Sequence, residues 1–319
     1  MSPENLHLRV SAAQEVAHNI RCFELRHPQG NGLPAFTAGA HIRVSTPSGA
    51  VRQYSLCNDP SETDRYQIAV KREGRGRGGS LSLVDGVQVG DLIEVGPPQN
   101  QFELDPRARQ VLLIAGGIGI TPLLAMARQL QSEGRRYTLI YLTRDPQSTA
   151  FLDELTQAPF ADSVRIHHDG GDPARALDLW PLLEKPGSLG GLQVYCCGPG
   201  GLMDAVRDMT GHWPANAVHF ESFTADSRSQ GDDQAFEVQL QGSGQIFEVP
   251  ADTSILQTLR NHGIAVPFSC ESGTCGSCKT GLVEGEADHR DLVLLEEEKS
   301  HRIMVCVSRS RGGRLVLDL

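Results

Sequence analysis

The sequence predicts three domains: an antiparallel β-barrel or sandwich, a doubly wound parallel α/β sheet, and a smaller C-terminal domain built around four cysteines. The chain has 319 residues, enough for two or three hydrophobic cores. Short strand-like runs separated by turn residues give way to alternating strands and helices after residue 105, and a polar stretch precedes the cysteines. We place the domains at residues 1–105, 106–228 and 236–319, with a linker at 229–235.

The composition is ordinary for a globular protein, with 39% apolar and 21% charged residues. The net charge of −10 argues against nucleic acid as a partner and gives no support to an anionic membrane surface. No apolar run reaches the roughly 18 to 20 residues of a membrane span, and the N-terminus lacks a signal region. Four of the eight cysteines are scattered over apolar segments, which suits the reducing cytoplasm. Nothing demands an oligomer, so we expect a monomer.

The first domain consists of short strands with little helix. The expected strands are 7–11, 20–26, 41–46, 51–57, 66–72 and 91–95. Glycines and prolines lie between them, which is typical of an antiparallel barrel or sandwich.

Two features of this domain are candidates for ligand binding. In the segment Arg52-Gln53-Tyr54-Ser55, the arginine can bind a phosphate and the tyrosine can flank a planar ring. The glycine-rich loop at 74–79 enters a predicted helix at Ser80, where free backbone N–H groups can bind a phosphate. An ordinary edge strand and a solvated hairpin tip are the alternatives.

The second domain alternates strands with helices. The expected strands are 111–115, 138–142, 164–167, 193–197 and 217–220, and the expected helices are 122–133 and 200–209. We expect Thr121 to cap the first helix and Gly134 to end it. This βαβ pattern predicts a parallel, doubly wound sheet.

Two glycine loops follow strands of this sheet. They are Gly116-Gly117-Ile118-Gly119 after the first strand and Cys197-Gly198-Pro199 after the fourth. Glycines at such places let a dinucleotide pyrophosphate approach a helix N-terminus, although a tight turn also needs glycine.

Two further segments concern the nucleotide. His167 and His168 are adjacent on a strand, so they face opposite sides and make a poor metal site. We expect Asp169 to contact a ribose hydroxyl. After the second strand, Arg144 suits a 2′-phosphate and Asp145 suits a 2′-hydroxyl.

The C-terminal domain is organised around four cysteines. These are Cys270, Cys275 and Cys278 at C-x4-C-x2-C spacing, and Cys306 after 27 intervening residues. This is the ligand spacing of a plant-type [2Fe–2S] cluster, and small residues such as Gly273 and Gly276 let the loop wrap it. A structural zinc site or unrelated buried thiols are the alternatives, but zinc sites usually pair two C-x2-C hooks and only one is present. We expect strands at 236–240, 245–249, 303–307 and 315–317, and a helix at 254–261.

Taken together, these motifs resemble the phthalate dioxygenase reductase family, which includes vanillate O-demethylase reductases, over essentially the whole chain. The resemblance implies an FMN barrel, an NAD domain and a β-grasp ferredoxin domain. The implied FMN residues are Arg52, Gln53, Tyr54, Ser55, Val70, Lys71, Gly78, Gly79, Ser80, Thr121 and Phe223. The implied NAD residues are Gly116, Gly117, Gly119, Asp169, Cys197, Gly198 and Pro199, with Cys197 near the nicotinamide. The implied cluster ligands are Cys270, Cys275, Cys278 and Cys306.

By this resemblance the chain takes electrons from NADH through FMN and one [2Fe–2S] cluster to a Rieske-type oxygenase. No side chain need act as a general acid or base, so no catalytic residue is assigned. Two other functions are open: a general NAD(P)H-dependent flavin or ferric reductase, and a non-enzymatic redox carrier or sensor.

Overall fold

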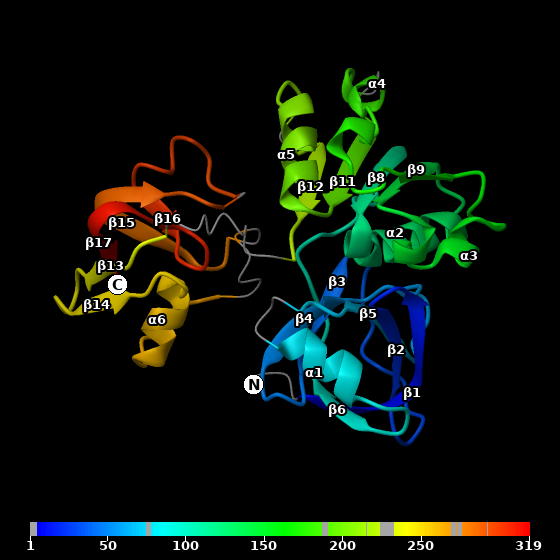
Figure 1. Cartoon of the computed structure of the whole chain (residues 1–319), viewed down its shortest axis with the longest axis horizontal. Coiled ribbons are helices and arrows are strands. Elements are labelled where there is room, and N and C mark those ends of the chain that lie inside the picture. Colours follow the sequence, from blue (N-terminus) through cyan, green and yellow to red (C-terminus); the bar gives the residue numbers. More distant parts are fainter. Residues whose placement is uncertain are drawn as a thin grey trace. The chain divides into compact units, whose positions relative to one another are not determined.

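The chain divides into two compact units, Met1–Glu221 and Ser222–Leu319 (Figure 1). The computed structural model describes residues 5–74, 78–186, 191–214, 216–223, 233–268, 273, 276–291 and 293–319. The predicted linker at 229–235 lies mostly outside these residues. Within the described ranges, no helix has the length and apolar character needed to cross a membrane.

The first unit begins with an antiparallel barrel. Its elements are β1 (Leu6–Ala17), β2 (Ile20–Arg26), β3 (Ala40–Ser45), β4 (Val51–Ser55), β5 (Tyr66–Lys71), α1 (Gly79–Gly86), β6 (Leu92–Val95) and β7 (Gln99–Asn100). The strand order is β4-β3-β6-β1-β2-β5, and β7 pairs with β3. A bridge between Leu56, just after β4, and Ile68 on β5 joins the two ends of this order. The sheet therefore closes, and a barrel rather than a sandwich forms.

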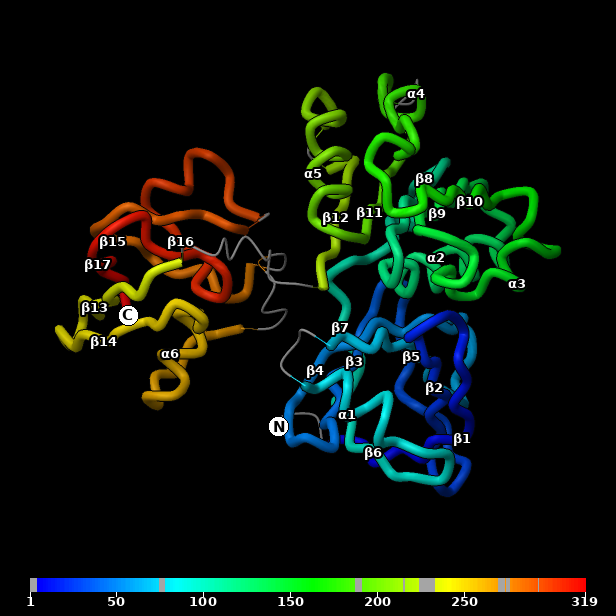
Figure 2. Tube along the Cα trace, viewed as in Figure 1, coloured from blue at the N-terminus to red at the C-terminus, as the bar shows by residue number. Residues whose placement is uncertain are grey.

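A five-stranded parallel sheet follows in the same unit. Its strands are β8 (Gln110–Gly116), β9 (Tyr137–Thr143), β10 (Val164–His168), β11 (Leu192–Cys197) and β12 (Val218–Glu221). The helices are α2 (Ile120–Ser132), α3 (Leu152–Leu155), α4 (Trp180–Leu183) and α5 (Gly200–Met209), with short 3₁₀ turns η1 (Gly117–Gly119), η2 (Pro146–Ser148) and η3 (Pro173–Arg175). The order β10-β9-β8-β11-β12 makes β8 and β11 neighbours, although β9 and β10 lie between them in the chain (Figure 2). Ligands of such sheets bind at this reversal, beyond the carboxyl ends of the strands.

The start of α2 corrects one prediction. Gly119, not Thr121, is the N-cap of the helix, and no side chain caps it. The reason is that η1 leads directly into α2, which places Thr121 inside the first turn. There its hydroxyl donates to the Ile118 carbonyl at 3.1 Å. The end agrees with the prediction, since Gly134 takes the left-handed conformation, φ 64°.

One hydrophobic core joins the barrel to the parallel sheet. Outward-facing barrel residues such as Cys22, Cys57 and Phe102 pack in the same cluster as Leu123 and Met126 of α2. The barrel interior has a separate core. The two halves of the first unit are therefore held together by shared apolar burial, the dominant favourable term in folding.

The second unit is a mixed sheet with one helix. Its elements are β13 (Phe236–Leu240), β14 (Ile246–Val249), α6 (Ile255–Asn261), β15 (Lys279–Asp288), β16 (Arg302–Met304) and β17 (Arg309–Asp318). The order is β14-β13-β17-β15-β16, with β13 and β17 parallel. The side chain of Ser254 caps α6 by accepting the Gln257 amide at 3.1 Å. This is the β-grasp fold that the family resemblance implied, and it has its own core.

The strands of this unit differ from those predicted. β15 was not expected, because its acidic, glycine-containing sequence lacks a regular alternation, and its pairing with β17 is interrupted by register shifts. Gly285 within it has φ 100°, a conformation that favours glycine. The strand expected at 303–307 is shorter, because β16 ends at Met304 and the chain then turns.

Candidate cofactor sites

The predicted phosphate-binding residues of the barrel lie side by side. A Cβ atom added to Gly79, the first residue of α1, would lie only 2.9 Å from Nε of Arg52 on β4. The Arg52 side chain therefore covers the first turn of α1. Gly78 precedes this turn in a left-handed conformation, and no side chain caps the helix. A helix N-terminus is partly positive, so a guanidinium group beside it creates a place that favours an anion such as phosphate.

The end of β5 leads toward this loop. Val70 is buried in the barrel core, so it can meet a cofactor only through its backbone. Lys71 is exposed and pairs with Glu73 at 3.6 Å. The Ser80 hydroxyl accepts the Glu73 amide at 3.2 Å and so ties the start of α1 to the chain leaving β5.

Tyr54 has a buried hydroxyl group without a hydrogen-bond partner among the described residues. Burial raises the pKa of Tyr54 to about 12, so the hydroxyl remains protonated at neutral pH and can donate. An unsatisfied buried polar group costs about 1–3 kcal/mol. A planar, acceptor-bearing ligand such as a flavin would relieve this cost, so the site fits the group. The neighbouring Gln53 is half-buried and pairs in register with Arg43 of β3.

The glycine loops after β8 and β11 are in direct contact with each other. A Cβ atom on Gly119 would lie 2.2 Å from the Cys197 carbonyl oxygen, and one on Gly116 would lie 2.6 Å from Cδ of Pro199. A Cβ atom on Gly198 would meet the backbone of Gly116 at 2.9 Å. These three glycines are therefore required because the two loops pack closely against each other. Gly117 differs, since it has φ 52° and open space around its Cβ position, where a ligand can approach.

Thr121 and Cys197 are both buried, at 2% and 0% exposure. Cys197 pairs in register with Ala115 on one side and Glu221 on the other. Burial, and secondarily the Glu221 carboxylate, raise the pKa of the Cys197 thiol well above its usual value. The thiol therefore remains neutral and has no activated, nucleophilic character.

The carboxyl end of β12 meets the end of β4. The Ser55 hydroxyl donates to Oε2 of Glu221 at 3.5 Å. The sequence analysis did not identify Glu221 as a site residue. The sequence feature that could have indicated Glu221 is its position as the last residue of the last parallel strand, because ligands bind at the carboxyl ends of such strands.

The two histidines of β10 have separate hydrogen-bond partners. His167 contacts the Arg175 carbonyl at 2.8 Å, and His168 contacts the Thr143 hydroxyl at 2.9 Å. Asp169 follows them and accepts the Gly171 amide at 2.6 Å, which orders the turn after β10.

Asp145 is also engaged locally after β9. Its carboxylate accepts the Ser148 amide at 2.8 Å and caps η2. The neighbouring Arg144 is exposed.

Two of the four predicted cluster ligands can be placed. Cys278 and Cys306 are 2% and 4% exposed. Lys279 pairs with Met304 in the antiparallel β15–β16 ladder, so both cysteines lie beyond the same end of it. Gly273 has φ 73°, and a Cβ atom there would meet the Val307 side chain at 2.7 Å, so this glycine lies close against that end of the ladder. The positions of Cys278, Cys306 and Gly273 fit a cluster held close to the protein backbone.

Cys270 and Cys275 lie outside the described residues. Phe223 belongs to the second unit and is 44% exposed.

Comparison with known proteins identifies two domain families. Residues 238–311 match the family described as "2Fe-2S iron-sulfur cluster binding domain", and residues 7–104 match "Oxidoreductase FAD-binding domain".

Whole-length relatives agree with these matches. The chain is 56% identical to phthalate dioxygenase reductase of Burkholderia cepacia, covering 98% of this chain and 97% of that one. It is 40% identical to a vanillate O-demethylase oxidoreductase of Pseudomonas sp., covering 97% and 98%. The solved structure of a phthalate dioxygenase reductase superposes with a TM-score of 0.82 at 54% identity, covering 100% of both chains. Similarity of this extent shows that the chain belongs to the phthalate dioxygenase reductase family and is an oxidoreductase with a flavin-binding domain and a [2Fe–2S] domain.

Proposed function

We propose that this chain is the reductase component of a Rieske-type aromatic oxygenase, taking electrons from NADH through FMN and a [2Fe–2S] cluster. The observation that carries the proposal is the contact between Ser55 and Glu221 at 3.5 Å. It brings the strand end proposed to hold the flavin against the edge of the parallel sheet proposed to hold the nicotinamide. Similarity to reductases of phthalate dioxygenase and vanillate O-demethylase supports an oxygenase as the partner, rather than a general flavin reductase function.

FMN is the proposed flavin. Arg52 and the uncapped first turn of α1 would hold its phosphate, and the Tyr54 hydroxyl would donate a hydrogen bond to the flavin. The other proposed contacts are Gln53, Ser55, Val70 through its backbone, Lys71, Gly78, Ser80, Thr121 and Phe223. When bound, flavin accepts a hydride and releases its electrons singly, which matches a one-electron cluster.

NADH is the proposed donor. Its pyrophosphate would lie on the open side of Gly117 at the start of α2, with Gly116, Gly119, Gly198 and Pro199 shaping the loops. Asp169 remains our proposed ribose contact, and Cys197 would lie near the nicotinamide. The choice of NADH over NADPH follows the family, and the fixed Asp145 carboxylate after β9 supports it, because it would repel a 2′-phosphate.

Cys270, Cys275, Cys278 and Cys306 are the proposed cluster ligands in a ferredoxin domain at 236–319. The barrel at 1–105 and the nucleotide domain at 106–228 complete the proposed organisation, with a linker at 229–235. We further propose a monomer that works in the cytoplasm. The buried free thiols Cys22, Cys57, Cys196 and Cys197 suit a reducing compartment.

An anaerobic titration of the purified protein with NADH tests the proposal. A visible spectrum with flavin bands over a broad cluster background, both bleaching as NADH is added, is the expected result. Acid-released flavin should be FMN, and NADPH should act only at much higher concentration. A protein that bound zinc without a cluster, or whose flavin NADH did not reduce, would overturn it. Adding the purified oxygenase should then oxidise the reduced cluster.

A further inference from the structure

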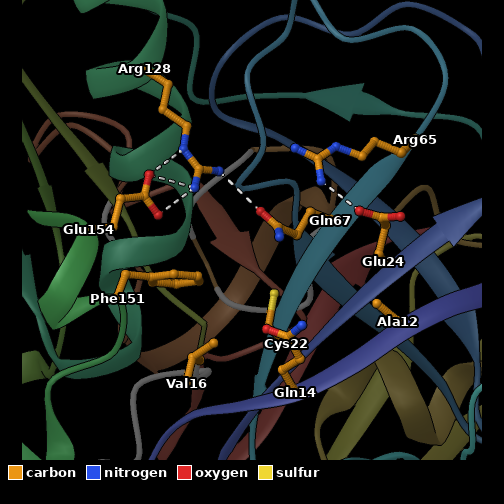
Figure 3. Close-up of a pocket in the computed structure, with 10 residues that line it drawn as sticks. All are labelled: Ala12, Gln14, Val16, Cys22, Glu24, Arg65, Gln67, Arg128, Phe151 and Glu154. Carbon is orange, nitrogen blue, oxygen red and sulfur yellow. Dashed lines mark hydrogen bonds and ion pairs between the residues drawn. The ribbon is translucent and has the colours of Figure 1, made fainter. Parts of the chain in front are cut away.

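A cleft of about 280 Å³ separates the outer face of the barrel from the helices of the nucleotide half (Figure 3). Barrel residues such as Cys22, Glu24, Arg65 and Gln67 form one side. Arg128 of α2, with Phe151 and Glu154, forms the other. None of the lining residues is a proposed cofactor contact. The residues that line the cleft therefore matter for how the barrel and the parallel sheet with its helices are held together.

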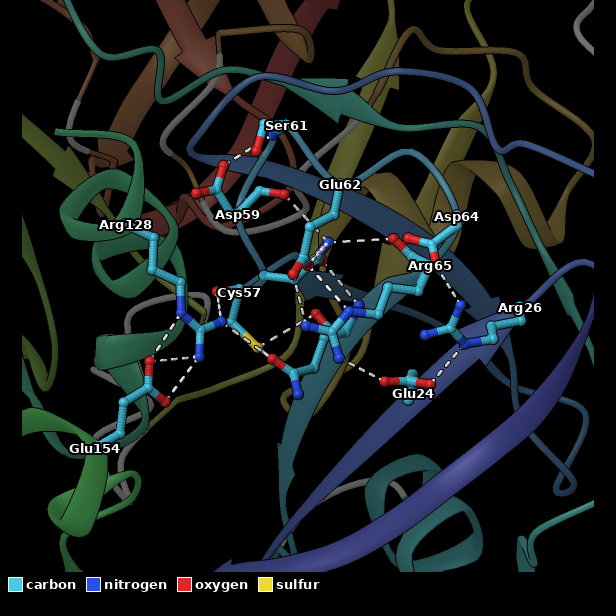
Figure 4. Close-up of polar contacts among 12 residues, drawn as sticks. Glu24, Arg26, Cys57, Asp59, Ser61, Glu62, Asp64, Arg65, Arg128 and Glu154 are labelled. Atoms are coloured by element: carbon cyan, nitrogen blue, oxygen red, sulfur yellow. Dashed lines mark hydrogen bonds and ion pairs between the residues drawn. The ribbon is translucent and has the colours of Figure 1, made fainter. Parts of the chain in front are cut away.

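Arg128 connects three segments that are distant in the sequence. Its Nε and Nη2 donate to both carboxylate oxygens of Glu154 on α3, at 2.7 to 3.0 Å. Its Nη1 crosses to the barrel and donates to the Cys57 carbonyl at 2.6 Å and to Oε1 of Gln67 at 3.1 Å. The side chain is only 15% exposed, so solvent screens these contacts weakly. Figure 4 shows the chain of contacts from Glu154 through Arg128 to the barrel.

The two ends of this connection are next to the two proposed cofactor sites. Cys57 lies two residues after Ser55, at the end of the strand proposed to hold the flavin. Arg128 lies on the helix whose N-terminus, Ile120, follows the glycine loop proposed to hold the dinucleotide. Arg128 lies eight positions after Ile120 in the helix, a distance of about 12 Å along its axis. A tilt of α2 by about 5° around Arg128 would thus move its N-terminus by about 1 Å.

We propose that Arg128 is a positioning residue for the transfer of hydride from NADH to the flavin. The inference rests on the proposed function. Apolar packing holds the barrel and α2 together but is not directional. The guanidinium adds fixed hydrogen bonds, which set the position of α2 relative to β4. Hydride transfer moves one hydrogen nucleus with two electrons, oxidising NADH and reducing the flavin, and it requires the two rings in near-contact.

The test compares four proteins loaded with flavin. Arg128→Met keeps an apolar side chain but removes all the hydrogen-bond donors of the guanidinium. Glu154→Gln keeps Arg128 but weakens the ion pair that orients its guanidinium. Arg65→Ala is the matched control, because Arg65 lines the same cleft but its side chain bonds to Glu24 and Glu62 within the barrel. Stopped-flow flavin reduction under anaerobic conditions gives the limiting rate at saturating NADH and the apparent Kd separately. A primary deuterium isotope effect shows that hydride transfer is measured.

We expect Arg128→Met to lower the limiting rate about 10- to 100-fold with a nearly unchanged Kd for NADH. Glu154→Gln should lie between it and the wild type, and Arg65→Ala should match the wild type. Hydrogen exchange in flavin-free protein is the second readout. Arg128→Met should increase exchange in peptides covering both 55–58 and 116–124, whereas Arg65→Ala should not.

Limiting rates equal to the wild type in both Arg128→Met and Glu154→Gln would overturn the inference. If Arg128→Met fails to fold or retain flavin, Glu154→Gln decides alone, and a wild-type rate for it counts against the role. An equal rate loss in Arg65→Ala would also contradict it, because general loosening of the barrel would then be the cause. Failure of NADH to reduce the wild-type flavin would instead refute the proposed function.

Discussion

Replacement of Gly119 by alanine tests the contact between the two glycine loops. The added Cβ would lie 2.2 Å from the Cys197 carbonyl oxygen, 2.5 Å from its carbon and 2.9 Å from the Gly198 nitrogen. All three atoms belong to backbone, so no side chain can rotate away. Restoring an ordinary contact requires the loops to separate by about 1 Å, a change we expect to cost about 1–3 kcal/mol of folding free energy. For a unit of this size, 2 kcal/mol lowers Tm by roughly 4–8 °C.

The assay is thermal unfolding of the flavin-loaded protein, followed by anaerobic reduction with NADH. Gly201→Ala is the matched control, because Gly201 lies in the first turn of α5 with nothing within 4 Å of its Cβ position. Alanine there should leave Tm unchanged or raise it slightly, since alanine favours helix. Gly119→Ala should also slow flavin reduction by about 100-fold, because the loop that we propose holds the nucleotide moves by about 1 Å. Equal Tm values and rates for the two variants would refute the close-packing argument.

Three further predictions follow from the sites. Cys275→Ala should abolish the cluster spectrum and electron delivery while NADH still reduces the flavin; a variant that keeps the cluster's visible and EPR signals would show that Cys275 is not a ligand. Arg52→Ala should weaken FMN binding about 10- to 100-fold, because it removes about one hydrogen bond to a charged group. Flavin retention equal to the wild type on dilution would contradict the phosphate role of Arg52. Burial alone would raise the pKa of Glu24, but hydrogen bonds from Arg26 and Arg65 lower it to about 2. Because this folded pKa lies below the ordinary 4.5, the stabilisation is full above about pH 4.5 and is lost as pH falls toward 2. Glu24→Gln should thus cost about 1–2 kcal/mol at pH 7 and less at pH 3 in chemical unfolding, and a pH-independent difference would argue against this carboxylate.

Much of the fold could be predicted because local sequence signals agreed with the tertiary structure. The structure gives β2, β13 and α5 the bounds that turn residues and hydrophobic patterns indicated. The prediction failed where a non-local constraint decided the outcome. β15 forms because β16 and β17 pair with it on both sides, despite its irregular sequence. Thr121 resembles a cap, but the preceding turn already provides the helix start.

The same difference between local signals and non-local constraints applies to the candidate sites. From the sequence, the residues around Arg52 and the two glycine loops could be predicted as candidates, since each is a short local motif. The sequence could not show that Gly116 and Gly119 are small because they pack against the segment after β11. Nor could it distinguish Arg128 from other helix arginines, because its partners Cys57 and Glu154 come from separate parts of the chain.

The distribution of hydrophobic cores has a consequence for how such a protein can diversify. A cut near residue 105 would divide the core that Cys22, Phe102 and Met126 share, leaving two exposed apolar surfaces. A cut at the boundary between Glu221 and Ser222 divides no such core among the described residues, since the second unit has its own. Recombination at that point would exchange the [2Fe–2S] domain as a unit while preserving the part of the chain that we propose binds NADH. Pairings with different oxygenases, the partner we propose, can therefore arise by gene fusion while the residues proposed to bind NADH and flavin stay unchanged.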